Sequence, residues 1–276
     1  MSEVAERRST FQRLHERGCF VLPNPWDVGS AKYLQHLGFS AIATTSAGFA
    51  FSRGAADGAV GLHAMLAHVR EIAEAVDVPV NADFENGYAD SPDEVAENAR
   101  LCAETGIAGL SIEDNSGRKD QPLYDVDLAA ARIRRVCEAL TGSGVVVTAR
   151  AECFLVGVDD IEEVLRRLRA YVAAGADCLY APGVTEREHI RAIVAAVAPK
   201  PVNLLISGPT AGLTVADASE LGVRRVSVGG ALARAAWGGF VRAAKQLAEQ
   251  GTFDGFGDAT LHDALQKMFR SAARRL

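Results

Sequence analysis

Two acidic residues, Asp83 and Glu85, lie one residue apart in the segment NADFENGYAD, at the end of an apolar run. If residues 78–85 form a strand, the alternation of side chains places both carboxylates on one face together with Asn81. A buried carboxylate is costly unless a cation or hydrogen-bond donors lie beside it. The pattern therefore predicts that other segments bring a metal ion or a cluster of donors to this face.

A third acid, Glu113, ends the apolar segment GLSIE and extends the set of oxygen ligands. Carboxylates without histidine suit a hard cation, most simply Mg²⁺ held partly through water, with Mn²⁺ as the alternative metal. The six histidines all fall in segments expected to be helices or loops, which disfavours a His-ligated zinc site. The five lysines are also away from the expected strand ends, which disfavours Schiff-base chemistry.

Arg150 stands two residues before Glu152 in VVVTARAE, so the two side chains share a strand face. A guanidinium among acids can bind a substrate carboxylate through two parallel hydrogen bonds. A structural network of salt bridges is the alternative interpretation. Cys153 follows directly and is a conceivable nucleophile, although a free cysteine is usually a small buried hydrophobic residue.

Residues within or directly after other apolar runs are further candidates for substrate contact: Trp26, Thr45, Ser46, Ala47, Gly48 and Asn203. Trp26 either forms an indole wall over the substrate or packs beside a helix that Asp27 caps.

The elements that must position these residues alternate regularly along the chain. Apolar, β-rich runs are expected to form strands at 19–24, 40–46, 78–85, 109–114, 145–152, 178–183, 201–207 and 225–230. Helical periodicity follows each of them, at 28–38, 62–76, 91–106, 127–140, 159–175, 185–197, 214–222 and 231–250. Eight such units predict an α/β fold, a (β/α)₈ TIM barrel, whose functional residues lie at the carboxyl ends of the strands.

No linker interrupts this series, so residues 1–276 are expected to form one domain. Residues 252–276 would be a C-terminal helical extension, with apolar residues on one stripe at Leu261, Ala264, Leu265, Met268, Phe269 and Ala272. This extra helix either packs across its own barrel or docks on another subunit.

Composition narrows the class of protein. A net charge of -6 without a basic patch argues against nucleic-acid binding. No segment has the apolar length of a membrane span, and the first twenty residues lack the apolar stretch of a secretory signal. The five cysteines form no CxxC pair, so we expect reduced thiols in a cytoplasmic protein.

The ordered segments NPWDVGSAKYLQHLGFSAIATTSAG, NADFENGYAD, SIEDN and TARAECFL resemble the isocitrate lyase / phosphoenolpyruvate mutase superfamily, over about residues 24–235. The resemblance implies a barrel whose terminal helix is exchanged between subunits, and a homotetramer made of two such dimers. It further implies that the backbone N–H groups of Ser46, Ala47 and Gly48, together with Arg150, bind the carboxylate of a 2-oxo acid. By the same resemblance, Asp83, Glu85 and Glu113 hold Mg²⁺ and Asp57 lies near the reacting group. The metal would stabilise an enolate formed when a neighbouring bond breaks.

The chain also departs from the superfamily pattern. The lyases carry a cysteine-containing gating loop, whereas residues 115–124, NSGRKDQPLY, contain neither cysteine nor histidine. Glu85 and Glu152 stand where aspartates are usual, and each adds a methylene group to the site.

Three functions remain open from the sequence. The first is Mg²⁺-dependent cleavage of a C–C bond in a small 2-oxo or 2-hydroxy dicarboxylic acid, as a lyase or an oxaloacetate-type hydrolase. The second is P–C chemistry, either hydrolysis of phosphonopyruvate or a mutase reaction, which would use Arg118 or Lys119 to cover a phosphonate. The third is a protein that binds 2-oxo acids without turnover.

Overall fold

A computed structural model describes residues 2–209 and 212–273. Eight parallel strands form one sheet in the order β1-β8-β7-β6-β5-β4-β3-β2. The open edge between β1 and β2 is bridged by a hydrogen bond from the Ala43 N–H to the Pro23 carbonyl, 3.0 Å long. The predicted (β/α)₈ barrel is therefore confirmed. Its strands are β1 (Phe20–Leu22), β2 (Ile42–Ala43), β3 (Val80–Asp83), β4 (Gly109–Glu113), β5 (Val146–Arg150), β6 (Cys178–Tyr180), β7 (Val202–Leu205) and β8 (Arg225–Ser227).

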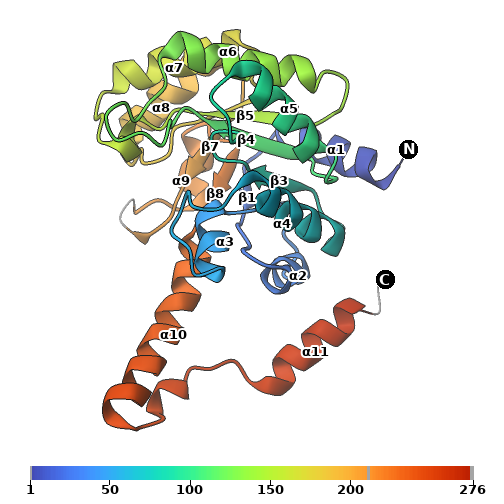
Figure 1. Cartoon of the computed structure of the whole chain (residues 1–276), viewed down its shortest axis with the longest axis vertical. Helices are drawn as coiled ribbons and strands as arrows, with labels where there is room; N and C mark the ends of the chain where they lie inside the picture. Colours follow the sequence, from blue (N-terminus) through green and yellow to red (C-terminus); the bar gives the residue numbers. More distant parts are fainter. Residues whose placement is uncertain (1, 210–211, 274–276) are drawn as a thin grey trace.

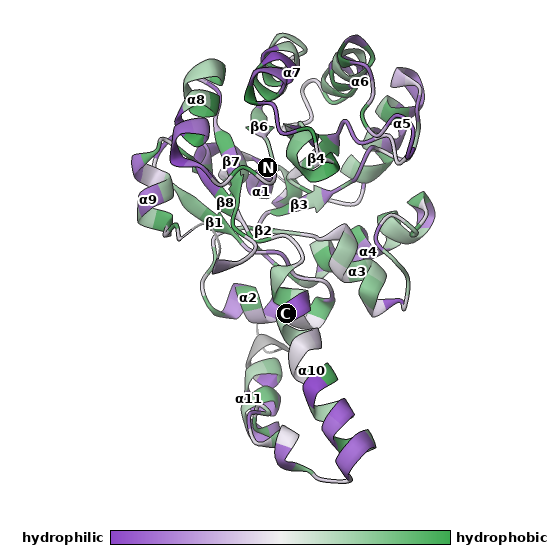
Figure 2. Cartoon of the chain, turned by 90° about the vertical axis from the view of Figure 1, so that its left-hand side faces the viewer, coloured by the Kyte–Doolittle hydropathy of each residue, from purple (hydrophilic) through white to green (hydrophobic). Residues whose placement is uncertain are grey.

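Helices surround these largely hydrophobic strands, as Figure 2 shows for α4 to α9. The barrel helices are α2 (Val28–His36), α3 (Ser46–Ser52), α4 (Leu62–Ala75), α5 (Pro92–Ala103), α6 (Val126–Ala139), α7 (Ile161–Ala173), α8 (Arg187–Val197), α9 (Val215–Glu220) and α10 (Ala231–Gln250). Local sequence sets several helix ends. The Ser91 hydroxyl accepts from the Glu94 N–H with Pro92 in the first turn of α5, and four glycines with positive φ follow α2, α5, α7 and α9: Gly38, Gly106, Gly175 and Gly222.

The N-terminal helix α1 (Glu3–Leu14) was not expected from the sequence. It covers the amino end of the barrel, where Phe11 is fully buried and joins an apolar cluster that contains Leu22 and Val146. The Arg8 guanidinium donates to the carbonyls of Ala103, Ile107 and Ser143. This helix therefore closes the base of the barrel, opposite the predicted site.

The strand expected at residues 78–85 ends two residues earlier in the structure than the sequence predicts. Strand β3 ends at Asp83, and Glu85 adopts a φ of 47°, in the left-handed region. Tyr88, with a φ of 59°, completes the turn before α5. The prediction that both acids share one strand face is wrong, because the turn redirects Glu85 while Asp83 stays on the barrel wall.

The carboxyl-terminal part of the chain forms an arm. Helix α10 runs away from the barrel and a short 3₁₀ turn, η3 (Asp254–Phe256), leads to α11 (His262–Ala273) (Figure 1). Helix α11 turns back toward α2, where the Phe269 ring faces Gly29. Apolar residues stay exposed on the arm: Trp237, Phe240, Val241, Leu247, Phe253, Phe256, Leu261, Leu265 and Phe269.

The predicted extension of residues 252–276 thus contains a helix, although its last three residues, and the side chain of Ala272, lie outside the described part. None of the helices in residues 2–209 and 212–273 combines the length and apolar character needed to cross a membrane. The organisation of residues 1–276 as one domain and the exchange of α11 between subunits stay proposals.

Candidate active site

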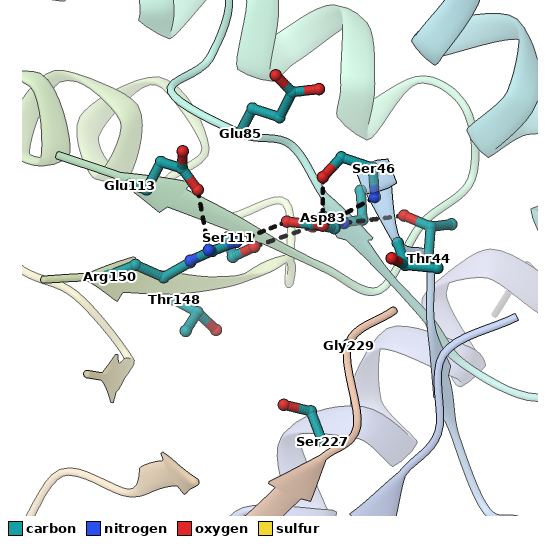
Figure 3. A network of polar contacts seen from close by, with 12 residues as sticks. Thr44, Ser46, Asp83, Glu85, Ser111, Glu113, Thr148, Arg150, Ser227 and Gly229 are labelled. Atoms are coloured by element: carbon teal, nitrogen blue, oxygen red, sulfur yellow. Dashed lines mark hydrogen bonds and ion pairs between the residues drawn. The ribbon is translucent and has the colours of Figure 1, made fainter. Parts of the chain in front are cut away.

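The site centres on Arg150, the last residue of β5. Its guanidinium forms ion pairs with Asp83 of β3 (2.7 Å) and Glu113 of β4 (3.0 Å) (Figure 3). A third ion pair joins it to Glu152, two residues after β5 (2.9 Å). All four side chains are largely buried. Because neighbouring parallel strands end at the same rim, residues far apart in sequence meet here.

Asp83 also fixes the loop after β2. Its Oδ2 accepts from the Ser46 backbone N–H at 2.9 Å and from the Ser46 hydroxyl at 3.0 Å (Figure 3). The Asp83 N–H donates to the Thr44 hydroxyl at 2.9 Å. Asp83 thus joins β2, β3 and Arg150.

The backbone of the 46–48 loop is partly used within the protein. Thr45 caps α3 by accepting from the Gly48 N–H, while the Ser46 N–H serves Asp83. Of the three N–H groups assigned to a carboxylate by resemblance, only that of Ala47 makes no such side-chain contact in the described part of the chain.

Glu85 lies further out and is held by a different partner. The Tyr88 hydroxyl donates to Glu85 Oε1 at 2.8 Å. Figure 3 shows its carboxylate separated from the Arg150 cluster, on the same side of the site as Glu113. The turn that redirects Glu85 therefore also supplies the tyrosine that orients it.

Negative charge exceeds positive charge at this rim. Burial, with acidic neighbours, raises the pKa of Asp57 and Glu113, while burial and nearby Asp83 raise the pKa of Glu85 to about 7. The groups that could bind a metal here are all carboxylate oxygens, so their charge and chemistry fit a hard divalent cation.

The geometry of the acids limits how such an ion would be bound. No group of three or more His, Cys, Asp or Glu side chains in residues 2–209 and 212–273 is arranged around one metal position. Arg150 already occupies one oxygen of Asp83 and one of Glu113. The acids thus fit an ion held through intervening water better than one chelated directly.

A cavity of about 160 Å³ opens beside Arg150 and extends down the barrel axis. Among the predicted site residues, it is lined by Thr45, Ser46, Ala47, Asp57, Asp83, Arg150 and Asn203. Trp26, Gly48, Glu85 and Glu113 do not line it. Asp27 does cap α2, and the Trp26 side chain packs behind Gly48, so contact of Trp26 with a substrate stays a prediction.

The far wall of the cavity includes Tyr180 and Arg225, which the sequence analysis did not single out. Tyr180, Arg225 and Ser227 line it together with Asn203. Figure 3 shows Ser227 and Gly229 across the site from Glu85 and Glu113. A signal was available for Tyr180, because it stands two residues after Cys178 in the run CLYAPG, so the two side chains share a strand face near the expected carboxyl end of the strand. The structure adds that Tyr180 pairs with Arg150 in register.

Other side chains that could act as nucleophiles or metal ligands do not line the cavity. Cys153 is buried, and burial raises the pKa of its thiol to about 12, which disfavours a thiolate nucleophile. The histidines lie in or directly after helices: His15, His36, His63, His68, His189 and His262. This confirms the expected placement of the histidines away from the strand ends.

Comparisons with known proteins place the chain in a family. The model of the phosphoenolpyruvate phosphomutase family matches residues 11–248. A solved structure described only as a lyase or mutase from Burkholderia cenocepacia J2315 is 45% identical, with a TM-score of 0.94 and 98% of each chain covered. The structure of 2,3-dimethylmalate lyase is 29% identical, with a TM-score of 0.84, covering 98% of this chain and 95% of that one.

Oxaloacetate acetylhydrolase, solved in complex with its product oxalate, is 27% identical, with a TM-score of 0.85, covering 96% of this chain and 94% of that one. The extent of these matches, over the whole barrel and the strand ends that carry Asp83, Glu113 and Arg150, decides the assignment. The chain belongs to the phosphoenolpyruvate phosphomutase family of enzymes, within the isocitrate lyase / phosphoenolpyruvate mutase superfamily.

Proposed function

We propose that the protein is a Mg²⁺-dependent enzyme that cleaves a C–C bond of a small 2-oxo or 2-hydroxy dicarboxylic acid through an enolate. The observation that carries this proposal is the position of Arg150, with its guanidinium between Asp83 and Glu113 at the wall of a small polar cavity. The named relatives cleave or hydrolyse small acids of this kind. The cavity volume also suits a substrate of only a few carbons.

Asp83, Glu85 and Glu113 would hold the cation, in part through water, as the separation of their carboxylates requires. When bound, the ion would polarise the 2-oxo group and stabilise negative charge as the bond breaks.

The chain's own residues supply binding and proton transfer. Arg150 presents its planar guanidinium to the carboxylate next to the oxo group, and the Ala47 N–H approaches the same carboxylate from the 46–48 loop. Asp57 lines the cavity together with Ser46, so Asp57 is placed to accept a proton from a substrate hydroxyl group or from water.

The P–C alternative receives less support from the structure. Arg118 stacks over the Tyr124 ring at 5.6 Å and pairs with Asp90 at 4.0 Å. Neither Arg118 nor Lys119 lines the cavity. A phosphonate would therefore require the 115–124 loop to rearrange.

A screen of candidate acids tests the activity. Wild-type protein with Mg²⁺ is incubated with oxaloacetate, 2,3-dimethylmalate, 2-methylisocitrate and phosphonopyruvate, and the products are identified by mass. We expect C–C cleavage of one of the first three. Phosphate or phosphoenolpyruvate formed from phosphonopyruvate would favour P–C chemistry, whereas oxalate binding without any product would favour a binding protein.

The metal assignment has a separate test. Asp83→Ala should weaken Mg²⁺ binding about 10- to 100-fold by calorimetry, because it removes an oxygen that orients the ion and its waters. Asp258→Ala removes an exposed acid on the arm and serves as the control. Unchanged Mg²⁺ affinity in folded Asp83→Ala protein would remove Asp83 from the metal site.

A further inference from the structure

Two basic side chains line the cavity, and their surroundings differ. Within residues 2–209 and 212–273, the cavity wall contains Arg150 and Arg225 and no other arginine or lysine. Arg150 already pairs with three carboxylates. Arg225 is 2% exposed, and in the same part of the chain its guanidinium bonds neutral side chains and forms no ion pair. The cavity therefore holds one cation whose charge is balanced and one whose charge is not.

Three neutral groups hold Arg225 in place. Its Nε donates to Asn203 Oδ1 at 2.8 Å. Its two terminal nitrogens donate to His15 Nε2 at 3.2 Å and to the Thr148 hydroxyl at 3.0 Å. A guanidinium has five N–H groups, so two of them remain for a ligand. Because a buried charge is costly without a partner of opposite charge, this arrangement favours the binding of an anion.

Arg225 lies deeper in the barrel than Arg150. Its guanidinium contacts Thr148, which stands two residues before Arg150 on β5 (Figure 3). Residues two apart on a strand face the same side and lie about 7 Å apart, so Thr148 belongs to the layer of side chains below Arg150. His15, another contact of Arg225, follows α1 at the base of the barrel. The cavity thus extends from Arg150 at the rim to Arg225 at the floor.

Apolar side chains complete the wall of the cavity. Leu22 of β1, Ala43 of β2 and Leu205 of β7 line it. A short carbon chain with a carboxylate at each end fits such a wall, because its ends meet guanidinium groups and its carbons meet apolar side chains. We propose that Arg225 binds the distal carboxylate of the substrate and so selects dicarboxylic acids over monocarboxylic acids of the same length. This inference rests on the proposed function, in which the other carboxylate binds at Arg150.

The burial of Arg225 is what makes the selection strong. A ligand that ends in a methyl group displaces water from the guanidinium and returns no hydrogen bond, so the site rejects it. The carboxylates of Asp57 and Asp83 line the same cavity and repel an anionic ligand. The unbalanced charge of Arg225 opposes that repulsion at the floor of the cavity.

Binding of matched ligands tests this subsite without requiring turnover. The Kd values of 2-oxoglutarate and 2-oxopentanoate, which have the same carbon chain and differ in the distal carboxylate, are measured by calorimetry with Mg²⁺. The wild-type protein should bind 2-oxoglutarate about 10- to 100-fold more tightly, the scale of a hydrogen bond to a charged group. Oxalate, whose two carboxylates are adjacent, reports on the rim near Arg150 alone.

Substitution of Arg225 should remove this preference. In Arg225→Gln protein, the two 2-oxo acids should bind within about threefold of each other, and the Kd of oxalate should stay within about threefold of the wild-type value because Arg150 is unchanged. Arg224→Gln is the matched control, since Arg224 is the preceding residue and bonds the Gly18 carbonyl away from the cavity. It should leave all three Kd values unchanged.

Each outcome decides the assignment. Equal affinity of the wild-type protein for the two 2-oxo acids overturns it without any variant. A preference that persists in folded Arg225→Gln protein also overturns it, and an equal loss of affinity for all three ligands reduces Arg225 to a structural residue. None of these results bears on C–C cleavage, which the screen of acids decides. Conversely, failure of that screen would leave a preference that depends on Arg225 in place.

A second variant covers the case in which Arg225→Gln does not fold. Arg225→Lys keeps the charge but loses the planar fork, so the preference for 2-oxoglutarate should fall at least about threefold while oxalate affinity stays the same. Thermal unfolding confirms that the variant is folded. A preference equal to that of the wild-type protein in Arg225→Lys would contradict a direct contact between Arg225 and the distal carboxylate.

Discussion

Arg150 serves two purposes at the residue scale. It neutralises part of a cluster of buried acids by pairing with Asp83, Glu113 and Glu152, and its guanidinium lines the cavity. The sequence left both a structural and a substrate-binding interpretation open. The geometry makes them compatible, because the three carboxylates pair with one nitrogen each and a planar group with five N–H donors still has two to offer a ligand.

Replacement of this side chain separates the two purposes. Arg150→Lys keeps the charge but loses the planar fork, so oxalate binding should weaken by roughly 1 to 3 kcal/mol, the scale of a charged hydrogen bond. Calorimetry measures the affinity, and thermal unfolding reports stability in the same preparation. We expect the melting temperature to fall as well, because one ammonium group cannot satisfy three carboxylates.

A matched control exists elsewhere in the barrel. Arg167 on α7 is also buried and pairs with Asp114 at 3.0 Å and Glu163 at 2.7 Å, away from the cavity. Arg167→Lys should lower stability and leave oxalate affinity unchanged. If Arg150→Lys behaves in the same way, Arg150 is only structural.

At the scale of elements, α1 connects the base of the barrel to its interior. His15 follows α1, and its Nδ1 donates to the Phe11 carbonyl at 2.8 Å while its Nε2 accepts from Arg225 at 3.2 Å. Both ring nitrogens are satisfied in the neutral tautomer. Burial, together with the Arg225 cation, lowers the pKa of His15 to about 3.

This arrangement predicts a loss of stability in acid. The unfolded chain binds a proton at His15 near pH 6.5 and the folded chain only near pH 3, so the free energy of unfolding should fall as the pH decreases between these values. We expect a contribution on the order of 1 to 3 kcal/mol, given the partial exposure of the ring. Denaturant unfolding at several pH values measures it.

The comparison variant is His15→Gln, whose side-chain oxygen accepts from Arg225 but does not titrate. Carboxylates protonate in both proteins, so the difference between wild type and variant isolates His15. Parallel stability curves for the two proteins would show that His15 titrates normally in the folded state.

At the scale of the whole molecule, the arm formed by α10, η3 and α11 is too apolar for a free surface. Leu261 is 77% exposed and Phe240 is 62% exposed, with further apolar side chains beside them. Exposed apolar area of this kind is usually covered by another protein surface. The family resemblance proposes a second copy of the chain as that partner, with α11 exchanged and two dimers forming a tetramer.

Removal of residues 257–276 tests this assembly. The truncated protein should form a smaller oligomer or aggregate, because it lacks the apolar residues of α11, and light scattering gives the mass. Leu261→Glu is a milder variant that keeps the helix and should also weaken association. A tetramer of unchanged stoichiometry after truncation would show that α11 only covers its own barrel.

The sequence by itself determined the barrel, its strand-helix order and most of the rim residues. Periodic apolar runs and local signals such as Ser91-Pro92 and Gly38 depend on neighbours a few residues away, so they can be interpreted without a structure. For the same reason Asp83, Glu113 and Arg150 were correctly expected at strand ends. The local sequence did not predict helices α1 and α3. Helix α1 is stabilised by packing against the base of the barrel, and α3 is a short helix that begins at the Thr45 cap.

Only the tertiary structure decided how the candidate site is arranged. The turn with positive φ at Glu85 moves that acid away from Asp83, against the alternation expected of a strand. The ion pairs of Arg150 and the hydrogen bonds that run from Arg225 through Asn203 to Ser227 join side chains from different strands. Such contacts depend on the register and closure of the sheet, which bring together residues separated by tens of positions, and no local pattern in the sequence specifies which way an amide or a hydroxyl group then points.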